Sequence, residues 1–158
     1  MTSKLDRRSL LVAAMAVALT PTVANAATLR TPHILFVCQF GTVKSPIARE
    51  LLKRRAAERD IALSVSARGI TPERHITPQL LKRLSSDGID PAAEPLRRLR
   101  KKDAASADLM IAFDKLPAGY QPRRFEDWSD LPSMVNDYDH ARAVLDERID
   151  KLLDRLAR

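Results

Sequence analysis

Residues 33–52 read HILFVCQFGTVKSPIARELL, and this stretch decides the fold. His33–Val37 is a largely apolar run, as in a strand buried on both faces of a sheet. A short loop with one Gly follows Cys38. Ser45 is then placed to cap a helix whose first position suits Pro46. The helical pattern continues with apolar residues on one face, at Ile47, Ala48, Leu51 and Leu52. The stretch therefore predicts a buried strand, a tight loop and an amphipathic helix.

Strands and helices alternate along the rest of the chain. We expect strands at residues 63–66, 109–113 and 124–126, and a helix that begins at Thr77-Pro78 and ends at Gly88. A last helix runs from near Asp139 to the end of the chain. This alternation predicts an α/β fold with a four-stranded parallel sheet and helices on both of its faces. Ligands of such folds bind beyond the carboxyl ends of the strands, where Cys38, Asp114 and Asp127 lie in the sequence.

The first 26 residues have the layout of an export signal. Basic residues precede an apolar run from Leu10 to Leu19, and Ala24-Asn25-Ala26 supplies the small residues of a cleavage site. The run is shorter than the roughly 20 residues that a membrane-spanning helix needs. Arg7-Arg8 fits the twin-arginine pattern. We therefore expect a signal peptide at 1–26, one domain at 27–158, export to the periplasm and no membrane span in the mature form.

Composition limits the chemistry that the domain can perform. The chain has a formal net charge of +7, which suits anionic ligands in general. It has one Cys, so it can form no internal disulfide, and its three His are far apart, without metal-ligand spacing. We expect no metal and no cofactor. The basic run Arg97–Lys102 is interleaved with Leu, which favours the exposed face of a helix over a nucleic-acid site.

Cys38 is either a nucleophile above an anion-binding loop or a small core residue at the end of a strand. Backbone N–H groups of residues 39–45 and the helix N-terminus would favour both a bound oxyanion and a thiolate. The Ser45 hydroxyl is placed to donate a hydrogen bond to the sulfur, and Lys44 adds a cation. These neighbours favour the nucleophile.

This stretch resembles the loop of the low-molecular-weight protein tyrosine phosphatases and the related arsenate reductases, which reads C-x5-R-S-P. Here the loop is Cys38, five residues, then Lys44-Ser45-Pro46. The resemblance continues in order through most of Thr31–Arg158. The turn Ser66–Gly69 is similar to the family's SAGT, residues 77–90 end in GID, residues 107–114 resemble its aDlIlaMD strand, and Phe125-Glu126-Asp127 occupies the place of its late DP motif.

The resemblance implies a mechanism for a phosphorylated small molecule or protein. Cys38 would attack phosphorus, while Lys44 and the loop residues Gly41, Thr42, Val43 and Ser45 would hold the phosphoryl oxygens. Asp127 would protonate the leaving oxygen and then activate water, with Asp130 as its rival for this role.

The departures from the family pattern keep two alternatives open. Lys44 replaces an Arg, which exchanges a bidentate fork for a flexible point charge and predicts a slow enzyme. Phe40-Gly41 replaces a Gly-Asn pair, Val43 replaces a second Cys, and Trp128 replaces the Pro after the general acid. One alternative is an oxyanion-binding protein without catalysis. The other is an arsenate reductase that depends on an external thiol.

Overall fold

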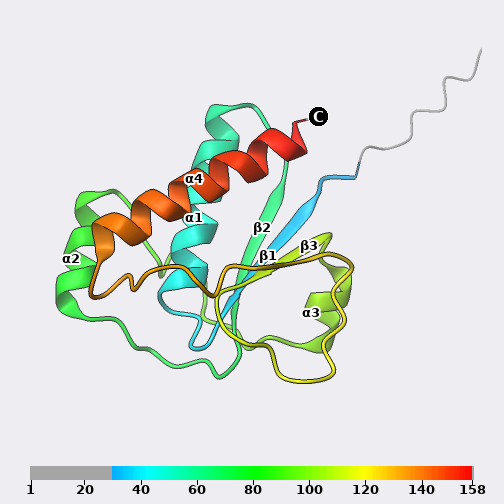
Figure 1. Cartoon of the computed structure of the whole chain (residues 1–158), viewed down its shortest axis with the longest axis horizontal. Coiled ribbons are helices and arrows are strands. Elements are labelled where there is room, and N and C mark those ends of the chain that lie inside the picture. The colour runs from blue at the N-terminus through cyan, green and yellow to red at the C-terminus, as the bar shows by residue number, and fades with distance from the viewer. Residues whose placement is uncertain (1–29, 158) are drawn as a thin grey trace, which may run out of the picture.

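A four-stranded sheet forms the centre of the computed structural model, which describes residues 30–157 (Figure 1). Its strands are β1 (His33–Cys38), β2 (Ser64–Gly69), β3 (Leu109–Ala112) and β4 (Phe125–Asp127). The order across the sheet is β2-β1-β3-β4, and every neighbouring pair is parallel. The predicted parallel sheet is confirmed. All four carboxyl ends meet at one edge, where β1 ends in Cys38 opposite Gly69 of β2.

Helices cover both faces of this sheet. Three helices, α1 (Lys44–Glu58), α2 (Pro78–Ser86) and α4 (Tyr138–Leu156), contribute to the core on one face, and α3 (Lys101–Ser106) covers the other. Successive strand side chains point to opposite faces. Ile34 and Phe36 of β1 therefore pack into the first core, and Leu35 and Val37 into the second. Burial on both faces explains why β1 is an apolar run rather than an alternating one.

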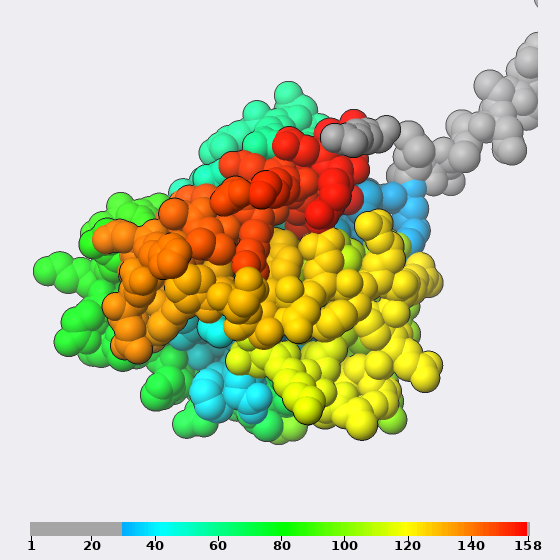
Figure 2. Space-filling model, viewed as in Figure 1, coloured from blue at the N-terminus to red at the C-terminus, as the bar shows by residue number. Residues whose placement is uncertain are grey.

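The long α4 presents one apolar stripe to the core. Its buried residues Ala141, Leu145, Ile149 and Leu152 recur at the spacing of one helix face. Figure 2 shows α4 as a ridge across one side of the molecule, with its other face in solvent. The stripe packs against α1, the helix that follows Cys38.

The expected role of Ser45 as a helix cap is wrong. Helix α1 begins at Lys44, its N-cap residue is Val43, and no side chain caps it. The Ser45 hydroxyl instead contacts the sulfur of Cys38. By contrast Thr77 does cap α2, because its side chain accepts a hydrogen bond from the N–H of Leu80. The hydroxyl at the start of α2 therefore caps its helix, whereas the hydroxyl at the start of α1 contacts the thiol.

The basic run 97–102 is only partly helical, unlike the prediction. Lys101 and Lys102 begin α3, but residues 97–100 precede it in extended form. The N–H of Gly69 donates to the carbonyl of Arg97, and the N–H of Leu99 donates to the carbonyl of Gly69. This pairing extends the β2 edge by two hydrogen bonds, and it buries Leu99 in the second core.

The expected signal peptide at 1–26 lies outside the described residues. Within residues 30–157, no helix has both the length and the apolar character needed to cross a membrane.

Candidate active site

Cys38 lies at the carboxyl end of β1, directly below the start of α1. Its residue is 4% exposed, and its Sγ lies 3.1 Å from the Oγ of Ser45. Ser45 is itself fully buried, and its hydroxyl also lies 3.4 Å from the carbonyl of Arg68. A hydroxyl in this position can donate to a thiolate and stabilise it. The two side chains that the sequence placed together are therefore in contact.

The loop between Cys38 and α1 presents free backbone donors. The N–H of Gln39 donates to Oδ2 of Asp114 at 2.9 Å. The N–H groups of residues 40–45 donate to no protein acceptor within the described chain. For Lys44 and Ser45 the reason is that the first N–H groups of α1 have no partner in the helix. Consecutive free N–H groups at a helix N-terminus form an anion-binding site. The loop can therefore hold an oxyanion next to the thiol.

A cavity of about 240 Å³ opens onto this loop. Its walls come from the loop, from the segment after β2, from the end of β3 and from the segment before α4. The lining residues are Cys38, Gln39, Phe40, Thr42, Val43, Lys44, His75, Asp114, Ser133, Met134 and Val135. We call it the Cys38 pocket. It brings together the predicted residues Cys38, Lys44, Thr42 and Val43, with Ser45 behind the sulfur.

Lys44 and Asp114 are the charged groups of the Cys38 pocket. The ammonium Nζ of Lys44 lies 4.0 Å from Oδ1 of Asp114, while Oδ2 of Asp114 accepts the N–H of Gln39. Asp114 thus fixes the first residue of the loop, and the lysine lies beside it. The ammonium remains partly exposed and free to turn toward an anion in the pocket.

Gly41 sits at the tightest point of the loop. Its φ is +72°, and a Cβ at this position would lie 2.8 Å from the backbone N of Gly69. The carbonyl groups of Cys38, Gln39 and Phe40 accept N–H groups of Ile70, Thr71 and Glu73 respectively. The loop is therefore bonded along its length to the segment after β2. Gly41 itself faces away from the Cys38 pocket and lines a neighbouring cavity.

The structure does not bring Asp127 into the Cys38 pocket. Asp127 ends β4 and lines an adjoining cavity, which shares Asp114 with the Cys38 pocket. Hydrogen bonds from the hydroxyl and the N–H of Ser129 lower the pKa of Asp127 below its usual value. The rival Asp130 is bound by both terminal nitrogens of Arg148, at 2.9 and 2.7 Å, and this lowers its pKa too. Both carboxyls are therefore ionised at neutral pH in this arrangement.

Trp128 is part of the core rather than a wall of the site. It is 5% exposed, and its ring lies 5.9 Å from that of Phe36 and 6.0 Å from that of Phe113. Its Nε1 donates to Oε2 of Glu126.

Sequence reasoning missed several residues of the site. Ser133, Met134 and Val135 line the Cys38 pocket from a segment without helix or strand periodicity, which gives no sequence signal. Asp114 was not missed, because the sequence places it after a buried strand, at the sheet edge where ligands bind. His75 also lies in the wall of the pocket, and it packs against Phe40 with ring centroids 5.9 Å apart.

Among the described residues, no group of three or more His, Cys, Asp or Glu side chains is placed to hold a metal ion. The arrangement is one thiol, one cation and a row of free amides beneath a small cavity. Together with a parallel sheet that ends at the thiol, it defines the class of proteins in which a cysteine loop binds an oxyanion.

Comparison with known proteins identifies the family within that class. Residues 33–150 match the sequence model of the low molecular weight phosphotyrosine protein phosphatases, so the chain belongs to this family and is a phosphatase-type hydrolase. No curated protein sequence matches the chain.

Solved structures with the same fold include phosphatases and arsenate reductases. The low molecular weight protein tyrosine phosphatase from T. tengcongensis is 19% identical, with a TM-score of 0.67 over 79% of this chain and 99% of that one. The thioredoxin-dependent arsenate reductase of Corynebacterium glutamicum is 23% identical, with a TM-score of 0.65 over 82% of this chain and 64% of that one. A mutant of the YwlE arginine phosphatase, whose active-site serine is phosphorylated, is 19% identical, with a TM-score of 0.65 over 80% and 96%.

Proposed function

We propose that the protein hydrolyses phosphate monoesters through a phosphocysteine intermediate at Cys38. The observation that carries this proposal is the contact between the Cys38 sulfur and the Ser45 hydroxyl, beneath the free N–H groups of residues 40–45. A thiol that served only the core would need neither a buried hydroxyl donor nor a row of unpaired amides around it.

The first step transfers the phosphoryl group to sulfur. The thiolate of Cys38 forms a bond to phosphorus as the bond from phosphorus to the ester oxygen breaks, and that oxygen leaves with a proton from a carboxylic acid. Negative charge on the three remaining oxygens is met by the loop N–H groups and by the ammonium of Lys44. In the second step water attacks phosphorus, the same carboxylate takes its proton, and inorganic phosphate and the thiolate are released.

We assign the proton transfers to Asp127, on the order of motifs in the family. Its carboxyl faces the cavity next to the Cys38 pocket, and Asp114 borders both cavities. A leaving group that extends from the pocket past Asp114 would come within reach of Asp127. Protonation requires that such a leaving group, or closure of the segment after β4, remove the carboxyl from the Ser129 donors that keep its pKa low.

Turnover of 4-nitrophenyl phosphate by purified protein tests the proposal. We expect hydrolysis that is lost in Cys38→Ser, and rapid chemical quenching should trap phosphate on Cys38 in the wild type. Activity that survives Cys38→Ser would show that the thiol is not the nucleophile. Vanadate binding without turnover would instead support an oxyanion-binding protein.

Arsenate consumption with an added thiol tests the reductase alternative. The chain has one Cys, so reduction of a Cys38 adduct would need an external thiol as electron donor. We expect phosphate ester hydrolysis to proceed without any thiol. Arsenate turnover with glutathione but no ester hydrolysis would reverse the assignment.

A further inference from the structure

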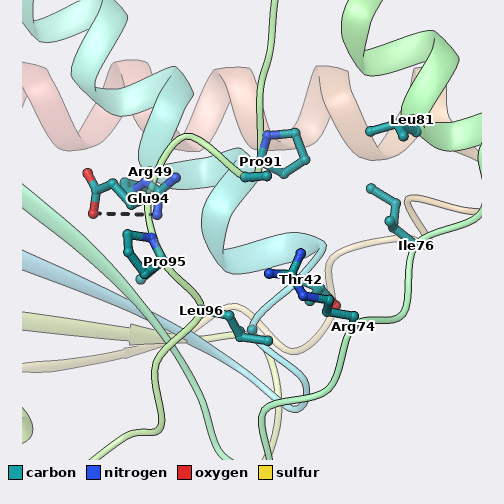
Figure 3. Close-up of a pocket in the computed structure, with 12 residues that line it drawn as sticks. Thr42, Arg49, Arg74, Ile76, Leu81, Pro91, Glu94, Pro95 and Leu96 are labelled. Atoms are coloured by element: carbon teal, nitrogen blue, oxygen red, sulfur yellow. Dashed lines mark ion pairs between the residues drawn. The ribbon is translucent and has the colours of Figure 1, made fainter.

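A second cavity beside the catalytic loop, of about 390 Å³, lies on the other side of Thr42 from the Cys38 pocket (Figure 3). It lies between α1, α2 and the segment 91–96 that precedes the basic run. Its apolar walls include Ile76, Leu81, Pro91 and Leu96. Its polar groups come from Thr42, Arg49, Arg74 and Glu94. We call it the Arg49 pocket. Nothing in the proposed catalytic steps uses it.

Arg49 is the unusual residue of this pocket. Its side chain is 2% exposed, yet its Nη2 has no hydrogen-bond partner among the described residues. Its Nε donates to Glu50 at 2.6 Å, and its Nη1 lies 3.5 Å from Glu94. Figure 3 shows the guanidinium reaching into the pocket beside Glu94. A buried guanidinium N–H without an acceptor is costly, so this site favours a ligand that brings an oxygen atom.

Arg74 supplies charge at the rim of the same pocket. It is exposed and forms no ion pair within residues 30–157, whereas Arg49 already faces two carboxylates. Leu81, whose residue is 47% exposed, forms an apolar part of the pocket wall. A fitting ligand therefore has an apolar body, an acceptor oxygen for Arg49 and a negative charge for Arg74.

The two pockets are separated by residues 74–76. His75 lines the Cys38 pocket, while Arg74 and Ile76 on either side of it line the Arg49 pocket. The hydroxyl of Thr42, which borders both, donates to the carbonyl of His75 at 3.3 Å. His75 and its two neighbours thus face opposite sides of this segment. A ligand against Arg74 and Ile76 therefore presses on the backbone that carries His75.

From these contacts we infer that the Arg49 pocket is a second binding site, which takes a small organic carboxylate or phosphate with an apolar body. The inference concerns binding and does not depend on turnover at Cys38, so the failure of one leaves the other intact.

The test uses 3-phenylpropionate as the probe and methyl NMR of the full chain as the readout. We expect chemical shift changes at Ile76, Leu81 and Leu96, with smaller changes at Val43 and Val135 of the Cys38 pocket. The neutral 3-phenylpropanamide should bind more weakly. Shift changes confined to Val43 and Val135, or none at millimolar concentration, would overturn the inference.

Two variants and one matched control locate the probe. Arg74→Ala should raise the dissociation constant about three- to fivefold, the size expected for an exposed ion pair. Ala92→Trp should abolish binding, because Ala92 lines the pocket from an exposed position that tolerates a larger side chain without disturbing the core. Arg124→Ala, also exposed but outside this pocket, should leave binding unchanged. Equal binding by wild type and Ala92→Trp would place the probe elsewhere.

Discussion

Lys44 occupies the position at which the family pattern has Arg, and its effect on rate can be estimated. An arginine binds two phosphoryl oxygens with parallel hydrogen bonds, whereas an ammonium offers a rotating point charge. One charge-assisted hydrogen bond is worth about 1.5–3 kcal/mol, or roughly ten- to a hundredfold in rate. We expect Lys44→Arg to raise kcat/KM by a factor in this range and to tighten vanadate binding similarly, as measured with 4-nitrophenyl phosphate.

The outcome of Lys44→Ala separates a role in the site from a role in the fold. Lys44 lies 4.0 Å from Asp114 in a partly exposed ion pair, and such pairs contribute little to stability. Loss of the ammonium should therefore weaken vanadate binding while the thermal unfolding midpoint changes little. If neither Lys44→Ala nor Lys44→Arg alters activity or anion affinity, Lys44 lies outside the catalytic machinery.

The proton could come from Asp127, Asp130 or Asp114. The dependence of kcat/KM on the leaving group distinguishes these three carboxylates. Loss of the general acid slows esters with poor leaving groups far more than esters with good ones. We expect this pattern for Asp127→Asn, measured as kcat/KM over a series of aryl phosphates. Asp130→Asn should behave as wild type, because Arg148 binds both oxygens of Asp130 away from the pocket.

Asp114→Asn serves as the control for loop geometry in the same series. It removes a charge from the pocket while keeping an acceptor for the N–H of Gln39. We expect a decrease that is equal for good and poor leaving groups. A steep dependence in Asp114→Asn, and none in Asp127→Asn, would move the proton donor into the Cys38 pocket itself.

At the scale of elements, the loop 38–44 depends on a glycine with two separate constraints. Gly41 has φ of +72°, and an added Cβ would lie 2.8 Å from the backbone of Gly69. Gly119 has φ of +90°, but its Cβ would meet only the end of the Lys101 side chain, at 3.4 Å. Gly119→Ala should therefore lower the free energy of unfolding by about 1–2 kcal/mol, because only the left-handed conformation opposes the new side chain. Gly41→Ala should lower the free energy of unfolding by more, and it should also impair vanadate binding. Urea unfolding of both variants measures the difference, and equal losses would remove the close approach to Gly69 as a constraint.

The pairing of β1 with β2 includes a titratable contact. Nε2 of His33 lies 2.8 Å from Oγ of Ser66. Burial, with the nearby charge of Arg68, lowers the pKa of His33 below 6.5 in the folded state. The unfolded chain therefore binds more protons as the pH falls below 6.5, and the stability contributed by neutral His33 is present above that pH and lost below it.

We accordingly expect the free energy of unfolding to fall as the pH decreases from about 6.5, with a smaller slope in His33→Gln. His140→Gln provides the control, because His140 lies on the exposed face of α4. Urea titrations at several pH values measure the slopes. Identical slopes in wild type and His33→Gln would contradict the assignment.

How much the sequence predicted depends on how local the determining interactions are. The strand at β1, the helix start at Thr77-Pro78 and the last helix from near Asp139 follow from adjacent residues, and the structure confirms them. The contact between Cys38 and Ser45 was also predictable, because both belong to one loop. The position of Asp127 beside the pocket, and the path of residues 133–135 into it, depend on how β4 and α4 pack. No short-range pattern encodes that packing.

At the scale of the whole molecule, the export hypothesis makes a separate prediction. The protein recovered from outside the cytoplasm should begin at Ala27, because Ala24-Asn25-Ala26 is the first small-residue site after the apolar run. N-terminal sequencing of the periplasmic fraction measures this. Replacing Arg7-Arg8 by two Lys should block export if the twin-arginine route is used. A protein that keeps Met1 and stays in the cytoplasm would contradict the prediction.

The packing of Trp128 gives the molecule an internal reporter. It is the only tryptophan in the chain, and its ring packs against Phe36 of β1 and against Phe113, which directly follows β3. Tryptophan emission therefore comes from one place in the core. The indole packs there against Phe36, which lies two residues before Cys38 in β1. Because the indole is buried behind the pocket rather than in its wall, its fluorescence should follow loss of the core and remain nearly constant on anion binding. Folding and ligand occupancy can thus be measured independently in one unlabelled sample.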